Sequence, residues 1–173
     1  MRIGTSWRAC ALSAALATLA AVAPAATIMT PKVTATALAT PLPLPYDEAA
    51  DAHAAVAGAK ARAKAGHKYL LLDFGGNWCP DCRVLAGVLD LPEVKPAVQQ
   101  TFEVVSIDVG RRTKNLDIAQ QYGVAVQGVP MLVIVDPDGH FVNSGNPSAL
   151  SDARSMSPQA IVDTIYGWIG ASH

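Results

Sequence analysis

Residues 69–82 read Tyr-Leu-Leu-Leu-Asp-Phe-Gly-Gly-Asn-Trp-Cys-Pro-Asp-Cys, an apolar run that passes through two glycines to a pair of cysteines. A short apolar run that ends in glycine is typical of a β-strand buried on both faces. Cys79 and Cys82 stand three positions apart where apolar residues begin to recur with helical spacing. Two thiols so placed lie on one face of a helix and can close a disulfide reversibly. The stretch therefore predicts a strand, a helix and electron exchange between sulfur atoms.

The rest of the chain alternates between predicted strands and predicted helices. Strands are expected at residues 102–108 and 130–135, and the turn at residues 136–140 should return the chain through Phe141 and Val142 as a hairpin. Apolar periodicity and terminal signals predict helices at about residues 47–65, 79–90, 92–100, 115–122 and 158–170. This order of elements predicts an α/β fold in which helices flank a central mixed β-sheet.

Residues 1–25 have the three parts of a secretory signal peptide. Arg2 and Arg8 form a positive head, residues 9–22 are apolar and lack acids, and Ala23-Pro24-Ala25 offers a cleavage site of small residues. The apolar run is shorter than the roughly 20 residues that a membrane-spanning helix needs. We therefore expect an exported protein, periplasmic or otherwise outside the cytoplasm, without a stable membrane span after cleavage.

Residues 26–46 are rich in alanine, threonine and proline, and we interpret them as a linker to a single domain at residues 47–173. Repeated prolines remove backbone donors and favour extended, solvated chain. Signal cleavage removes two of the 13 basic side chains and none of the 14 acidic ones, so the mature chain is acidic. Its charge argues against nucleic acid or an anionic membrane surface as a partner.

Cys79 and Cys82 are the two cysteines that remain once Cys10 is removed with the signal peptide. A disulfide that closes a loop of two residues restrains the unfolded chain very little, so a structural purpose is disfavoured. Zinc requires four ligands, and the histidines that would complete a site are scattered at His53, His67, His140 and His173. C-type haem attachment needs a histidine where Arg83 stands. The sequence therefore predicts no cofactor and no metal site.

The two cysteines should differ in reactivity. Cys79 lies at the start of the predicted helix, where free N–H groups and a partial positive charge stabilise a thiolate, so Cys79 should attack and Cys82 should resolve. Pro80 fits the first helical turn and makes the loop between the sulfurs rigid. Asp81 places a negative charge nearby, which should oppose thiolate formation and make the pair more reducing.

Several segments together resemble the thioredoxin family. They are Leu72-Asp-Phe-Gly-Gly-Asn-Trp-Cys-Pro-Asp-Cys82, the strand 102–108, Tyr122-Gly-Val124 and Gly128-Val-Pro-Met131. More narrowly, the chain is similar to exported thioredoxin-like domains of bacterial thiol:disulfide interchange proteins, over about residues 50–170. The resemblance implies the thioredoxin-like fold, with a mixed sheet between helices.

The resemblance also implies roles for individual residues. Asp73 matches the family's buried acid, whose raised pKa lets it take the proton of Cys82. Val104 stands where thioredoxin has a lysine near that acid. Pro130 matches the family's cis-proline, which holds the backbone of Val129 beside the attacking sulfur, where an extended substrate can pair as an added strand. The implied substrate-contacting residues are Trp78, Pro80, Asp81, Val129 and Pro130.

The function expected from the sequence is that of an exported thiol-disulfide oxidoreductase, a disulfide reductase or electron relay. Cys79 would attack a substrate disulfide, and Cys82 would release the reduced substrate. Its partners would be proteins with a disulfide or dithiol and an upstream electron donor or acceptor, and the protein is expected to be a monomer. Two alternatives stay open: a periplasmic disulfide oxidase, and a copper carrier or assembly factor that uses the same thiols as ligands.

Overall fold

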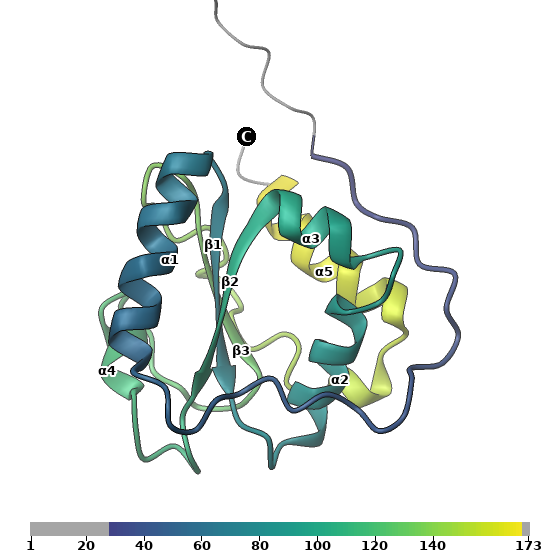
Figure 1. Cartoon of the computed structure of the whole chain (residues 1–173), viewed down its shortest axis with the longest axis horizontal. Helices are drawn as coiled ribbons and strands as arrows, with labels where there is room; N and C mark the ends of the chain where they lie inside the picture. The colour runs from purple at the N-terminus through teal and green to yellow at the C-terminus, as the bar shows by residue number, and fades with distance from the viewer. Residues whose placement is uncertain (1–27, 171–173) are drawn as a thin grey trace, which may run out of the picture.

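The computed structural model describes residues 28–170, so the predicted signal peptide at residues 1–25 lies outside the described residues. The helices and strands follow one another in the order shown in Figure 1. Their bounds are α1 Ala52–Gly66, β1 Tyr69–Gly75, α2 Pro80–Leu89, α3 Lys95–Thr101, β2 Phe102–Asp108, α4 Leu116–Gln120, β3 Met131–Val135, the 3₁₀ helix η1 Ala153–Ser155 and α5 Pro158–Gly170. None of these helices is long and apolar enough to cross a membrane.

The sheet is mixed, with strand order β2-β1-β3. β1 runs parallel to β2 and antiparallel to β3, and every residue of β1 is buried. Both predictions made for residues 69–74, a strand and burial on both faces, are confirmed, and the strand continues through Gly75. The register places Asp73 opposite Ser106 on one side and Leu132 on the other, in the middle of the sheet.

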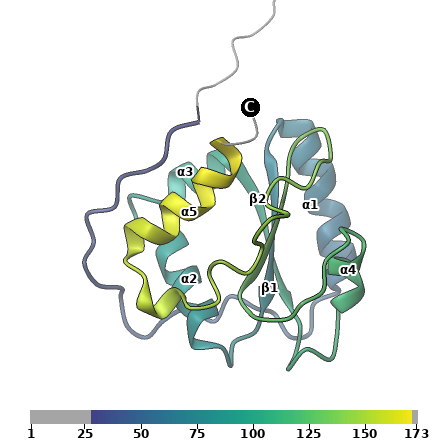
Figure 2. The same ribbon diagram turned by 180° about the vertical axis from the view of Figure 1, so that it is seen from behind.

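Helices cover both faces of the sheet. α1 and α4 lie on one face and α2, α3 and α5 on the other, as the two opposite views show (Figures 1 and 2). Side chains alternate along β1, so Leu70 and Leu72 contribute to the core under α1 and α4, whereas Leu71 packs with Leu85 of α2. Each fully buried leucine contributes roughly 1.5–3 kcal/mol. The alternation directs Asp73 to the same face as Leu71, toward α2.

The predicted hairpin after β3 forms, and it is short. Phe141 makes an antiparallel bridge with Val135, and backbone hydrogen bonds of 2.9 Å join Asp136 to His140 and Val142 to Ile134. Beyond this bridge, the buried side chain of Asn143 takes the place of further strand pairing. Its Oδ1 accepts from the N–H of Ile134 at 2.8 Å, and its Nδ2 donates to the carbonyl of Leu132 at 2.9 Å. A side-chain amide thus satisfies the edge of β3.

α1 begins at Ala52, later than the start near residue 47 that the sequence predicted. Asp47 uses its carboxylate to accept from the N–H of Ala49, which forms a local turn in competition with a helix. Asp51 instead caps the helix by accepting from the N–H of Ala54.

The interpretation of residues 26–46 as a solvated linker is corrected by the described part of that segment. Residues 33–46, which we call the strap, run along the domain beside α3 and α2 and then toward the start of α1 (Figure 1). Glu93 accepts from the N–H groups of Thr34 and Ala35, and the Arg83 guanidinium donates to the carbonyls of Leu42 and Pro43. Proline-rich chain cannot form its own hydrogen-bond ladder, and here side chains of the domain bind its backbone groups.

Candidate redox active site

The two cysteines form a disulfide at the start of α2, with their Cα atoms 5.3 Å apart. Cys79 is the N-cap of the helix, and its sulfur accepts from the N–H of Cys82 at 3.2 Å. Pro80 occupies the first helical position, where its missing N–H costs no hydrogen bond. A thiolate at Cys79 would receive the same N–H and the positive end of the helix dipole, which lower a thiol pKa.

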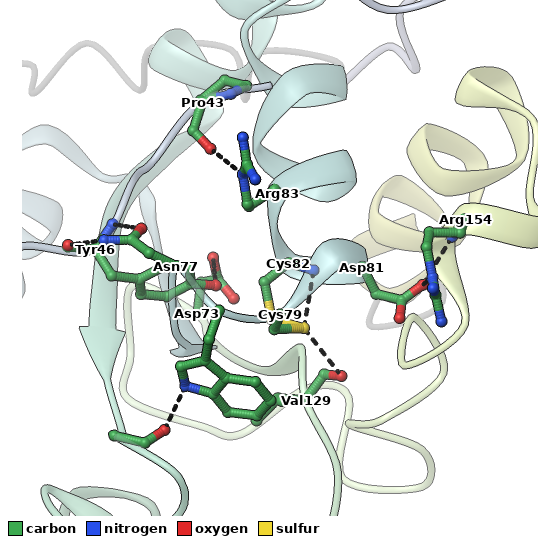
Figure 3. Close-up of a disulfide and its surroundings, with 12 residues drawn as sticks. Pro43, Tyr46, Asp73, Asn77, Cys79, Asp81, Cys82, Arg83, Val129 and Arg154 are labelled. Atoms are coloured by element: carbon green, nitrogen blue, oxygen red, sulfur yellow. Dashed lines mark hydrogen bonds and ion pairs between the residues drawn. A yellow bond between two sulfur atoms is a disulfide. The ribbon is translucent and has the colours of Figure 1, made fainter. Parts of the chain in front are cut away.

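The two cysteines differ little in burial, since Cys79 is 3% exposed and Cys82 is fully buried. They differ in the groups that surround their sulfur atoms. The sulfur of Cys79 lies 3.7 Å from the carbonyl oxygen of Val129, which precedes Pro130 through a cis peptide bond (Figure 3). The structure thus brings together Cys79, Val129 and Pro130, which are far apart in the sequence. The carbonyl of Val129 is a backbone acceptor next to the sulfur that is expected to attack.

Asp81 lies inside the domain, away from the contact surface that we expected for it. Its Oδ1 accepts from the backbone N–H of Arg154 at 2.9 Å and from the guanidinium Nε at 3.0 Å. The side chain points from α2 toward the segment that carries Arg154 (Figure 3). This ion pair offsets the negative charge beside Cys79, so the predicted opposition of Asp81 to a Cys79 thiolate is weaker than sequence alone suggested.

Trp78 is at the surface, with 40% of its area exposed. Its indole N–H donates to the carbonyl of Gly110 at 2.7 Å, and the guanidinium carbon of Arg111 lies 5.1 Å from the ring centroid. A hydrogen bond and a cation–π contact hold the ring in one place without burying it. Trp78 is therefore a fixed aromatic surface next to Cys79, as a substrate-contacting residue would be.

Asp73 is almost completely buried, and loss of hydration raises the pKa of its carboxyl to about 7. One oxygen, Oδ2, accepts from the hydroxyl of Tyr46 at 2.8 Å, which works against that rise. The other oxygen, Oδ1, is buried and has no hydrogen-bond partner among the described residues. A carboxyl with this pKa can both take and release a proton at neutral pH.

Tyr46, the last residue of the strap, was missed by sequence reasoning. The signal that could have found it is that it is the only aromatic residue between positions 26 and 46. Val104, at the position of the family lysine, is half-exposed on β2, and Tyr46 provides the polar contact to Asp73 instead. Its backbone exchanges two hydrogen bonds with Asn77: the Tyr46 N–H donates to Oδ1 at 3.1 Å, and Nδ2 donates to the Tyr46 carbonyl at 2.7 Å.

Gly75 allows the phenol and the buried sulfur to come close together. A Cβ at this position would lie 2.8 Å from the sulfur of Cys82 and still closer to the hydroxyl of Tyr46. Since Gly75 and Asp73 are two positions apart on β1, they face the same side of the strand. Figure 3 shows the Asp73 carboxylate between the Tyr46 side chain and Cys82.

The protein-family model described as thioredoxin-like matches residues 51–137, which include both cysteines and all three strands. The chain belongs to the thioredoxin-like family. Among solved structures, a disulphide isomerase from Xylella fastidiosa Temecula1 is 43% identical to this member, with a TM-score of 0.68, and the match covers 73% of this chain and 97% of that one. A mutant thioredoxin from Halobacterium salinarum NRC-1 is 28% identical, with a TM-score of 0.37 over 60% and 79% of the two chains. No curated protein matches the chain.

These findings confirm the thioredoxin-like fold and the mixed sheet flanked by helices that the sequence predicted. Together with the Cys79–Cys82 disulfide, the family match and the similarity to a disulphide isomerase support protein-disulfide oxidoreductase activity. Such thioredoxin-like proteins act on dithiol or disulfide substrates.

Proposed function

We propose that the protein is an exported thiol-disulfide reductase or electron relay whose substrates are disulfide-containing proteins. One observation carries the proposal: Cys79 stands at the N-terminus of α2 beside the backbone of Val129, while Cys82 is buried beside the Asp73 site. The arrangement separates an attacking sulfur, next to a place where substrate can bind, from a resolving sulfur next to a base. Export is supported by the composition of residues 1–25.

The reaction runs in two exchanges when the pair is reduced. The Cys79 thiolate attacks one sulfur of the substrate disulfide, which breaks that bond, forms a mixed disulfide and releases the other substrate sulfur as a thiolate. Cys82 then gives its proton to Asp73 and attacks the sulfur of Cys79. The Cys79–Cys82 disulfide forms, the second substrate sulfur leaves, and the substrate has gained two electrons. A dithiol protein outside the cytoplasm would return two electrons to the pair.

Substrate would bind as an extended segment along Val129. The backbone of Val129 lies next to Cys79, and main-chain pairing at such a place adds affinity without demanding a particular sequence. Trp78, fixed beside the sulfur, supplies an aromatic contact. Such a surface suits many unfolded or flexible substrates.

Disulfide isomerisation is a second candidate, because the Xylella fastidiosa protein that is 43% identical to the chain is a disulphide isomerase. An isomerase uses the same attack by Cys79 but returns the protein to the dithiol form without net electron transfer. The copper-carrier alternative would use the reduced Cys79 and Cys82 as its two thiolate ligands.

The reduction potential of the Cys79–Cys82 couple tests the proposal. We would equilibrate the mature protein with dithiol and glutathione buffers and follow the fraction oxidised, then assay net reduction of a disulfide-containing protein against rearrangement of a scrambled one. If the protein is a reductase or relay, the reduction potential of the Cys79–Cys82 couple is lower than that of the substrate disulfide, so the substrate oxidises the pair. Turnover then requires a dithiol donor that reduces the pair again. A pair that stays reduced while scrambled disulfides rearrange indicates an isomerase, and Cu(I) binding without thiol exchange indicates a carrier.

A further inference from the structure

Tyr46 reaches the redox site from outside the family-matched region, which begins at residue 51. It is 2% exposed, and its ring packs with Cys79 and Cys82 in a small cluster of buried residues. Asn77, two residues before Cys79, uses its side-chain amide to exchange two hydrogen bonds with the backbone of Tyr46. The strap is therefore hydrogen-bonded to the loop that precedes α2, and its Tyr46 side chain lies in the interior of the domain.

The carboxyl of Asp73 has unequal surroundings on its two oxygens. Oδ2 is occupied by the Tyr46 hydroxyl at 2.8 Å, whereas Oδ1 is buried without a hydrogen-bond partner in the described part of the chain. A buried polar atom without a protein partner is costly, and a catalytic role is one of the reasons for which such atoms occur. The sulfur of Cys82 and the hydroxyl of Tyr46 both lie within contact of the space over Gly75, on the same face of β1 as Asp73.

We infer that Tyr46 is a positioning residue for proton transfer in the resolving step: its hydroxyl holds Oδ2 of Asp73 and leaves Oδ1 as the acceptor for the proton of Cys82. The inference rests on the proposed function, because it concerns the step in which Cys82 attacks the mixed disulfide. In that step Cys82 loses its proton to Oδ1, its thiolate attacks the sulfur of Cys79, and the substrate sulfur leaves with the electron pair of the broken bond.

The hydroxyl also lowers the pH at which Asp73 can act as a base. A donor to the ionised carboxylate lowers its pKa, so removal of the hydroxyl leaves burial unopposed and raises the pKa. Among residues 28–170, charged groups near Tyr46 include Asp108, whose negative charge helps to raise the pKa of the phenol, and Lys114, which forms an ion pair with Asp108. The pKa of the phenol itself is far above its ordinary value, because of burial first and the charge of Asp73 second. Tyr46 thus stays protonated and remains a donor throughout the working range.

A two-phase reaction isolates the resolving step. Reduced protein mixed with Ellman's reagent first releases thionitrobenzoate when Cys79 attacks, and releases a second equivalent when Cys82 resolves the mixed disulfide. We would record both phases by stopped flow between pH 5 and 9 for the wild type and for Tyr46→Phe. In Tyr46→Phe we expect the pH midpoint of the second phase to rise by about one unit. The second phase should then be about tenfold slower below the midpoint and recover at alkaline pH, while the first phase keeps its profile.

A matched control is Tyr122→Phe, which removes the hydroxyl of a partly buried tyrosine outside the cysteine cluster and should leave both phases unchanged. A second measurement uses the oxidised protein, in which the cysteines do not titrate: the carboxyl-carbon NMR signal of Asp73 should titrate at higher pH in Tyr46→Phe. If Tyr46→Phe does not fold, Asn77→Ala weakens the seat of Tyr46 and should shift the second phase in the same direction.

The outcomes separate the two ideas. The inference is overturned, and the proposed function stands, if the pH midpoint of the second phase is the same in the wild type and in Tyr46→Phe. This holds also when the second phase of Tyr46→Phe is slower by the same factor at every pH, because a purely structural role has that effect. Absence of thionitrobenzoate release from the wild type overturns the proposed function, and the inference with it.

Discussion

Replacing Asp73 with asparagine should change how the stability of the oxidised protein depends on pH. The carboxyl has an ordinary pKa of 3.8, and burial raises it to about 7 in the folded state. A raised pKa means that the folded protein binds the proton more tightly than the unfolded chain does. The stability contributed by this proton is therefore present below the unfolded pKa and is lost as the pH rises through the folded pKa.

The magnitude follows from the two pKa values. Between pH 5 and pH 8 the unfolded carboxyl is already ionised, whereas the folded one passes from almost fully protonated to almost fully ionised. Linkage then gives a loss of about 2.5 kcal/mol from this one group over that interval. Asparagine has a similar shape and does not titrate, so Asp73→Asn should be free of this loss. Any fixed cost of an unpaired amide N–H cancels when the two pH values are compared.

The assay is urea unfolding of the oxidised wild type and of Asp73→Asn at pH 5, 6, 7 and 8. The free energy of unfolding of the variant minus that of the wild type should rise by about 2.5 kcal/mol across the series. Asp163→Asn is the control, since Asp163 is exposed and its carboxylate accepts from the amide of Gln159, which does not titrate. A difference between variant and wild type that stays constant from pH 5 to pH 8 would refute the reasoning, because it would mean that Asp73 does not titrate in that range.

Three further perturbations address the sulfurs and the packing around them. Cys82→Ser should accumulate mixed disulfides with substrates, visible on non-reducing gels, whereas Cys79→Ser should form none; preferential alkylation of Cys82 in the reduced wild type would contradict this. Arg154→Gln leaves Asp81 without its cation and should raise the pKa of the Cys79 thiol by up to about one unit, measured as the pH midpoint of alkylation. The control is Lys95→Gln, because Lys95 begins α3 and pairs with Asp90 at the C-terminal end of α2. Asn143→Ala should destabilise the fold by about 2 kcal/mol in urea unfolding, since two buried backbone groups of β3 lose their partner; a loss below about 0.5 kcal/mol would mean that water replaces the amide.

Local sequence signals predicted most of the architecture. The apolar run of β1, the apolar periodicity of α2 and the apolar run of β3 each describe a segment that has few ways to bury its side chains. The predicted start of the first helix was wrong for a local reason. At Asp47, a polar side chain bonds to nearby backbone and replaces the helical turn that the pattern favoured.

The features of the redox site likewise depend either on local sequence or on tertiary contacts. The sequence by itself determined that two thiols stand one turn apart at a helix start, because that depends on a spacing of three residues. Only the tertiary structure decided that Asp81 pairs with Arg154, 73 positions away, and that Tyr46 meets Asp73 across 27 positions. Such contacts depend on which distant segments the fold brings together. The proline-rich strap has no apolar periodicity, so its sequence does not predict where it packs on the domain. One of these contacts also affects the pKa of Asp73: burial raises this pKa, and the hydrogen bond from the Tyr46 hydroxyl lowers it.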